Sequence, residues 1–195
     1  MRLLSKKGEK RIYNTPIEVR ENSEENQPRI LEGYAAVFNQ KTTIEGCFEE
    51  VLMPGAFTRT LMENKDIVAL VNHNFDNVIG RTSNGLLNLY EDDYGLKFEL
   101  HIPDDDDYAE QIYNKVKNKN LKDCSFLFLD VVEEWDHSTE LPLRILHDVD
   151  LIEISLVTLP AYEGTEVSAR SKERASNGAR RTQLKNKIKH LLGDK

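Results

Sequence analysis

The chain has 195 residues, 39% of them hydrophobic, which is enough for one domain with its own core and too few for two full domains. Its formal net charge of −8 and its sequence pI near 5.2 argue against a protein dedicated to binding nucleic acid. Two cysteines form neither a disulfide framework nor a zinc pattern, so we expect a reducing compartment and no metal site. No apolar run approaches the roughly 20 residues that a membrane-crossing helix needs, so we expect no membrane association.

The two ends of the chain are polar. Residues 1–29 contain a solvated stretch, 21–28, that has almost nothing to bury, and we expect a flexible N-terminal segment that ends near Arg29. Residues 171–195 carry most of the nine basic residues found from Arg170 onward, and we expect a basic tail that is flexible or forms a short helix. The sequence therefore predicts one folded domain over residues 30–170.

The first half of this domain reads as short strands with one helix. Apolar patterning predicts strands at 30–38, 48–52, 67–71 and 79–82, and a helix over 56–63. The run at 67–71 is continuously apolar and ends at Asn72, His73 and Asn74. Polar side chains at the exit of a buried strand are typical of a functional site.

A hairpin and a second helix follow. Residues 86–90 and 96–102 flank a turn with Gly95, and the second of these strands alternates apolar and polar residues, which indicates one buried face. The aspartates at 104–107 supply an N-cap and favourable charge for a helix over 108–119, with Asn120 as its left-handed terminator. Their spacing does not match a calcium-binding loop.

Two later strands carry polar residues inside apolar patterns. The strand around Ser125 is apolar on both faces, so its hydroxyl either bonds quietly to a neighbour or belongs to a site. Extended structure resumes at 143–146, and in a further strand at 151–158 Glu153 lies between apolar neighbours. A carboxylate there is costly without a partner, which makes Glu153 a candidate for a functional residue.

Many short strands, hairpin links and only two internal helices predict a mainly β protein whose antiparallel sheet closes into a barrel or sandwich. Ser125, His73 and Glu153 lie on or after separate predicted strands. A serine hydroxyl needs a base as it attacks a carbonyl, and a histidine can supply that base near neutral pH while a carboxylate holds its ring. Triads occur in several chain orders, so spacing alone does not establish one.

Several blocks resemble the maturation serine proteases of tailed-phage proheads. They are EGYAAVFN at 32–39, EVLMPGAF at 50–57, Asn72 with His73, IGRT at 79–82, the Ser125–Phe126 strand and EISLVTLPAY at 153–162. These six blocks occur in the same order as in that family and cover about residues 30–170.

The resemblance implies a herpesvirus-protease-like fold, a closed antiparallel β-barrel of about seven strands with flanking helices. It implies a serine endopeptidase without a cofactor that is packaged inside the procapsid in the host cytoplasm. Its substrates would be the scaffolding segment of the major capsid protein or a scaffold protein, and also itself. By matching motif, His73 would be the general base and Ser125 the nucleophile. We expect Glu153 as the third member.

Alternatives stay open at this point. Herpesvirus relatives use a second histidine as third member, so His147 competes with Glu153, followed by Asp148 and Asp150. Cys124 invites a thiol-nucleophile interpretation, but its side chain points away from that of Ser125 and is expected to be a small buried hydrophobe. A catalytically inactive capsid-assembly or scaffolding module is the alternative function, and an unrelated β-barrel binding module is the next. The resemblance also allows a homodimer, and it implies no nucleic acid or membrane partner.

Overall fold

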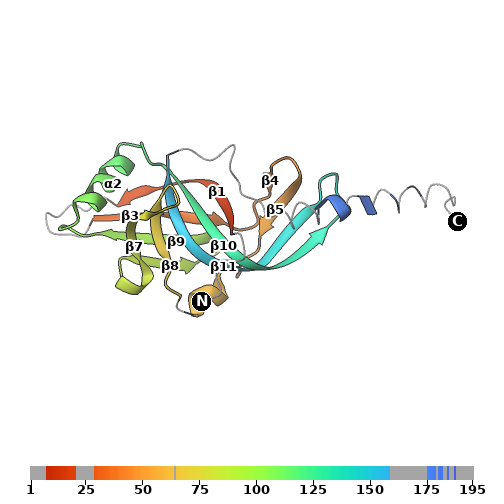
Figure 1. Ribbon diagram of the computed structural model, residues 1–195, viewed down its shortest axis with the longest axis horizontal. Coiled ribbons are helices and arrows are strands. Elements are labelled where there is room, and N and C mark those ends of the chain that lie inside the picture. The colour runs from red at the N-terminus through yellow and green to blue at the C-terminus, as the bar shows by residue number, and fades with distance from the viewer. Residues whose placement is uncertain are drawn as a thin grey trace.

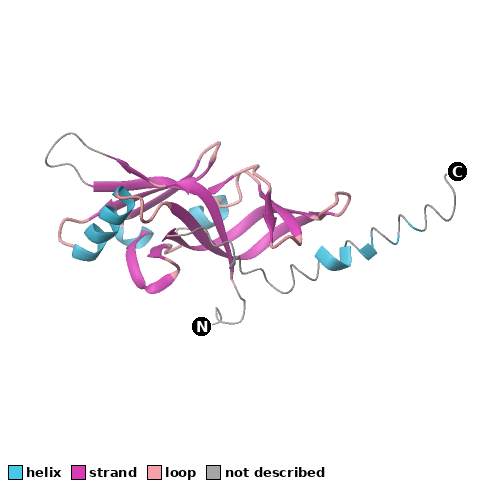
Figure 2. Cartoon of the chain, turned by 90° about the horizontal axis from the view of Figure 1, so that it is seen from above, coloured by secondary structure: helices cyan, strands magenta, loops and turns pink. Residues whose placement is uncertain are grey.

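A computed structural model describes residues 8–20, 29–63, 65–158, 175–178, 180–181, 184 and 187. Two β-sheets make up most of it (Figure 2). Sheet A contains β1 (Glu9–Pro16), β4 (Thr42–Ile44), β5 (Phe48–Leu52), β6 (Val68–Val71), β7 (Asn74–Arg81), β10 (Asp123–Asp136) and β11 (Leu143–Val157). Sheet B contains β2 (Glu18–Arg20), β3 (Arg29–Val37), β8 (Leu87–Glu91) and β9 (Gly95–Ile102), and the helices are α1 (Thr58–Met62), α2 (Asp107–Lys117) and the short 3₁₀ helix η1 (Thr82–Asn84).

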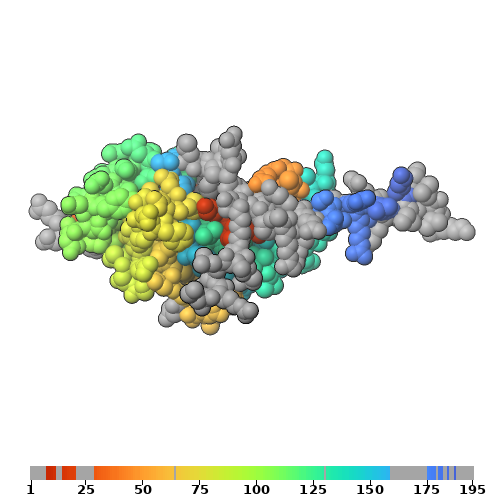
Figure 3. Space-filling view, viewed as in Figure 1, coloured from red at the N-terminus to blue at the C-terminus, as the bar shows by residue number. Residues whose placement is uncertain are grey.

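The strand β11 organises sheet A. It pairs with β10 in antiparallel fashion along nearly its whole length, and β1 lines the other edge of β10. On its remaining edge, residues 143–146 pair in parallel with β5, and residues 153–156 pair in parallel with β6. The far ends of β10 and β11 extend beside β4 and β5 to one side of the main body (Figures 1 and 3).

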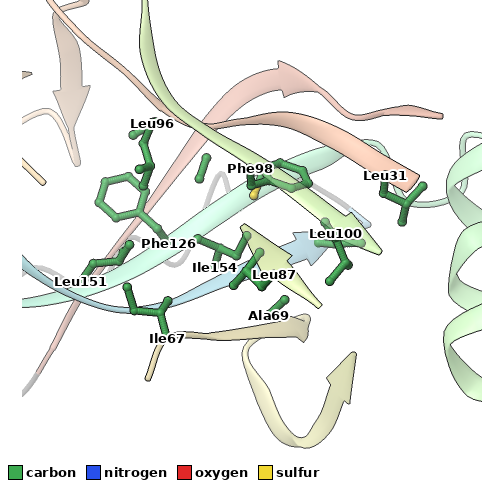
Figure 4. Close-up of a cluster of buried hydrophobic side chains, with 14 of the residues drawn as sticks. Leu31, Ile67, Ala69, Leu87, Leu96, Phe98, Leu100, Phe126, Leu151 and Ile154 are labelled. Carbon is green, nitrogen blue, oxygen red and sulfur yellow. The ribbon is translucent and has the colours of Figure 1, made fainter. Parts of the chain in front are cut away.

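The main core lies between the two sheets (Figure 4). Leu31, Phe98 and Leu100 of sheet B are buried in one cluster with Phe126 and Ile154 of sheet A. Burial of these apolar faces supplies the main driving force that holds the sheets together. A smaller cluster of Ile44, Phe48 and Ala175, with Trp135 packed against it, lies at the extended end of β10.

The mainly β fold class is confirmed, but the closed antiparallel barrel is wrong for the described part of the chain. There, sheets A and B are separate, and β11 makes two parallel pairings. The alternation of apolar residues predicts the strands and their buried faces. Closure of a sheet into a barrel depends on which strand edges pair with each other, and the apolar pattern does not encode that pairing. The two strands predicted at 143–146 and 151–158 are one strand that continues through irregularities in its pairing with β10.

The predicted flexible segment over residues 1–29 is also wrong for residues 9–20, which form β1 and β2. At the other end, the described residues 175–178, 180–181, 184 and 187 are helical, and the rest of the predicted tail lies outside the described residues. The helix α2 begins as predicted, with the side chain of Asp106 accepting from the backbone N–H of Ala109, but its left-handed terminator is Lys119 and not Asn120. None of the described helices is long and apolar enough to cross a lipid bilayer.

Candidate active site

Ser125 lies on β10, between β1 on one edge and β11 on the other. Its Cα partners are Ile12 of β1 and Ser155 of β11. Its neighbours Cys124 and Phe126 are fully buried, because β10 is an interior strand that pairs on both edges. Ser125 itself has no exposed surface, so its hydroxyl must find its partners within the protein.

His73 lies in the tight turn between β6 and β7. Because β6 pairs in parallel with the last third of β11, with Val71 opposite Leu156, the turn that follows β6 comes to lie beside that part of β11. The side chain of His73 is 14% exposed, so it borders solvent while most of the ring is covered.

Glu153 lies on β11, opposite Leu127 of β10, and has no exposed surface. Its Oε1 lies 2.6 Å from Nδ1 of His73, and Nε2 of His73 lies 2.7 Å from Oγ of Ser125. An ionised carboxylate only accepts hydrogen bonds, so Nδ1 carries the ring proton and Nε2 faces the hydroxyl as an acceptor in the neutral imidazole. The three sequence candidates therefore form one continuous chain of hydrogen bonds, which can take a proton from the serine.

The same hydroxyl has a second acceptor. Oγ of Ser125 lies 2.9 Å from the backbone carbonyl oxygen of Arg11 on β1. A serine hydroxyl has a single proton, so donation to Arg11 competes with donation to His73. Strand β1 is thus a direct neighbour of the candidate nucleophile, which the sequence analysis missed.

Buried charges hold β1 against the other strands of sheet A. Arg11 bonds to Glu50 at 2.5 Å, and Arg144 bonds to Glu9 at 2.6 Å, Glu50 at 2.9 Å and Glu133 at 2.5 Å. Burial opposes the charge of the Arg11 guanidinium, but Glu50 and Glu9 outweigh this effect and raise its pKa. Burial likewise opposes ionisation of Glu9, but Arg144 and Arg11 outweigh it and hold the pKa of its carboxyl below the usual value.

The β-prone residues Ile12, Tyr13, Ile17 and Val19 were the signal that could have revealed strands β1 and β2.

Comparison with known proteins bears on this site. A family model described as caudovirus prohead serine protease matches residues 15–180. The chain belongs to this family. Members of the prohead serine proteases include proteins of tailed phages, and the matched range contains His73, Ser125 and Glu153.

A prohead protease of Escherichia phage T5 is similar to this chain over a shorter stretch. The two are 31% identical over 99 residues, which are 51% of this chain and 43% of the phage T5 protein. The aligned part thus spans less than half the length of that relative. No solved structure matches the chain at a significant level.

The alternatives to Glu153 lie away from His73. The side chain of His147 is 44% exposed, and its Nε2 lies 3.6 Å from Glu134. Asp148 bonds to Arg59 at 2.6 Å, and Asp150 forms ion pairs with Arg59 and Lys65. The structure does not bring any of these three side chains to His73.

Cys124 is fully buried in the main core, as the sequence analysis expected of a small hydrophobe. Burial, with the nearby charge of Glu153, raises the pKa of its thiol far above the usual value. Because the thiolate is the reactive form, Cys124 is not a competing nucleophile.

Proposed function

We propose that this chain is a serine endopeptidase in which Ser125 is the nucleophile, His73 the general base and Glu153 the acid that orients His73. The observation that carries the proposal is the hydrogen-bonded chain from Glu153 through His73 to Ser125, with distances of 2.6 and 2.7 Å. Three residues from β11, the β6–β7 turn and β10 converge in the order that acyl transfer requires.

The chemistry follows from this order. As Oγ of Ser125 bonds to the carbonyl carbon of the substrate, its proton moves to Nε2 of His73, and Glu153 stabilises the imidazolium that forms. When the C–N bond breaks, His73 returns that proton to the leaving amine, and an acyl-enzyme ester on Ser125 remains. Water then attacks the ester with His73 again as base, which releases the new carboxyl end and restores the serine hydroxyl.

Access to Ser125 is part of the proposal. The residue has no exposed surface and contacts the Arg11 carbonyl. A peptide can therefore reach its hydroxyl only after the chain around it moves. His73, which is partly exposed, marks the side from which the substrate approaches.

Membership of the prohead serine protease family supports the substrate class. We infer that the enzyme acts inside the procapsid in the host, on the scaffolding segment of the major capsid protein or on a scaffold protein, and that it also cleaves itself. The alternative is a catalytically inactive module that assists capsid assembly, and the experiment must distinguish that module from an active protease.

The test is the intact mass of the capsid precursor, and of this chain, after co-expression of the precursor with the wild type or with Ser125→Ala. Ser83→Ala is the matched control, because Ser83 is exposed and lies in η1, outside the site. We expect shortening with the wild type and Ser83→Ala and none with Ser125→Ala. Shortening by all three would contradict the role of Ser125, and no shortening in particles that contain the wild-type chain would favour the assembly module.

A further inference from the structure

The turn that carries His73 has an unusual backbone. Asn72 and His73 both have positive φ angles, 52° and 57°. A two-residue loop between antiparallel strands requires this left-handed region at both positions, and a histidine adopts it less readily than glycine or asparagine does. What holds this turn therefore determines where the imidazole lies.

Three hydrogen bonds tie the turn to the end of β11. The N–H of Asn72 donates to the Leu156 carbonyl at 3.0 Å, and the Thr158 N–H donates to Oδ1 of Asn72 at 3.2 Å. The N–H of His73 donates to Oγ of Ser155 at 3.1 Å. Of these contacts, the one with Ser155 is made by His73 itself.

Ser155 also contacts the carboxylate. Its Oγ donates to Oε2 of Glu153 at 2.6 Å, while the other oxygen of Glu153 faces Nδ1 of His73. Ser155 lies two residues after Glu153, on the same face of β11, and has no exposed surface. Its hydroxyl thus uses its proton on Glu153 and accepts a bond from His73, so one side chain fixes both members of the pair.

We propose that Ser155 is a positioning residue of this site, which sets the His73 backbone and the Glu153 carboxylate relative to each other. The inference rests on the proposed protease function. Ser155 acts through His73 and Glu153, because its hydroxyl bonds to both of them. Removal of its hydroxyl takes away the bond to the His73 N–H, one of the three that tie the turn to β11, and leaves Oε2 of Glu153 without this donor, so the imidazole loses its alignment with Ser125.

Ser155→Ala is the test variant, since it removes the hydroxyl without adding volume. Thr60→Val is the matched control: Thr60 is also fully buried, and its Oγ1 donates to the Val149 carbonyl at 2.7 Å and accepts from the Leu151 N–H at 3.3 Å, both on β11. Both variants lose a buried hydroxyl that supports the same strand. Only Ser155 touches His73 and Glu153.

Two readouts separate positioning from general stability. The first is kcat and KM for cleavage of the capsid precursor. We expect Ser155→Ala to lower kcat about 10- to 100-fold, the range for residues that orient ligating or catalytic groups, and to keep KM within about twofold of the wild type. The second is the low-field proton resonance of the His73 Nδ1–H, which we expect to shift or broaden in Ser155→Ala alone. Thr60→Val should lower thermal stability without changing either readout.

The inference is overturned if Ser155→Ala keeps kcat within about twofold of the wild type, or if Thr60→Val at equal thermal stability loses as much activity. The resonance needs no catalytic turnover. If the wild type cleaves nothing, the proposed function fails, while an unchanged resonance in Ser155→Ala refutes the role of Ser155 independently.

Discussion

The buried ion cluster that holds β1 beside Ser125 gives a prediction with a definite magnitude. The side chain of Arg144 is 1% exposed and lies within 3.1 Å of oxygens from three carboxylates, those of Glu9, Glu50 and Glu133. Arg144→Met keeps much of the side-chain volume but removes one of the two arginines that the described part of the chain places among these carboxylates, the other being Arg11. Removal of one partner from a buried ion pair costs about 3–5 kcal/mol, because the uncompensated charge stays buried.

The matched control is Arg29→Met. Arg29 bonds to Asp104 at 3.1 Å and Glu110 at 2.8 Å, and these two side chains are 94% and 47% exposed. Solvent-exposed ion pairs contribute about 0–1 kcal/mol, so this variant removes the same chemical group at little expected cost. The contrast between the two variants isolates the effect of burial.

The assay is urea unfolding of both variants, with the free energy of unfolding taken from the midpoint and slope. Thermal unfolding supplies a second measure, in which 3–5 kcal/mol corresponds to a fall in Tm of about 6–20 °C for a chain of this size. If the two variants lose the same free energy of unfolding within about 1 kcal/mol, the cluster does not hold β1 in the way that the contacts indicate.

Three further predictions follow from the site and its surroundings. The folded-state pKa of Glu9 lies below its ordinary value of 4.5, so the stability that Glu9 contributes is present above that pH and is lost as pH falls through the folded pKa. Urea unfolding from pH 7 to pH 3 should therefore show a steeper loss of the free energy of unfolding for the wild type than for Glu9→Gln. Equal slopes would contradict this. Iodoacetamide should modify the exposed Cys47 and leave the buried Cys124 unmodified in the native protein, as read by peptide mass, and rapid modification of Cys124 would be inconsistent with the structure. Glu153→Gln keeps the shape of the side chain and removes its charge, so kcat should fall on the order of 10⁴-fold. His147→Ala should retain wild-type kcat, since His147 does not contact His73. The opposite ranking would make His147 the third member.

The candidate site was largely predictable because its residues disturb local patterns. Ser125 interrupts an apolar strand, Glu153 is an acid among apolar neighbours, and His73 follows a continuous buried run. Each signal lies within a few residues of sequence, and each of these segments is a strand or directly follows one, although the Glu153 strand begins earlier than predicted, at Leu143. The family resemblance then supported His73 and Ser125, while it left His147 as a competitor of Glu153.

The burial of strand β1 was not predictable in the same way. Glu9 and Arg11 read as solvated charges, yet their partners Glu50 and Arg144 lie far along the chain. A charged residue can be buried only where a distant counter-charge meets it, and local sequence does not reveal that meeting. The error hid the contact between the Arg11 carbonyl and Ser125.

The pairing of strands was likewise beyond local patterns. The parallel pairings of β11 with β5 and β6 join segments about 90 residues apart, and they place the His73 turn beside Ser155. The role of Ser155 depends on this pairing, since in the sequence it is one more small residue in an apolar strand.

The most direct test of the account is the reaction of Ser125 with a fluorophosphonate, which forms a stable adduct with a serine hydroxyl that a neighbouring base activates. Wild type, Ser125→Ala and His73→Ala are treated, and the adduct is located by mass in the tryptic peptide of residues 123–144. The account predicts one adduct on Ser125 in the wild type, none in Ser125→Ala and a much slower reaction in His73→Ala. No adduct on Ser125 in a wild-type chain that cleaves the capsid precursor, or an equal rate in His73→Ala, would contradict it.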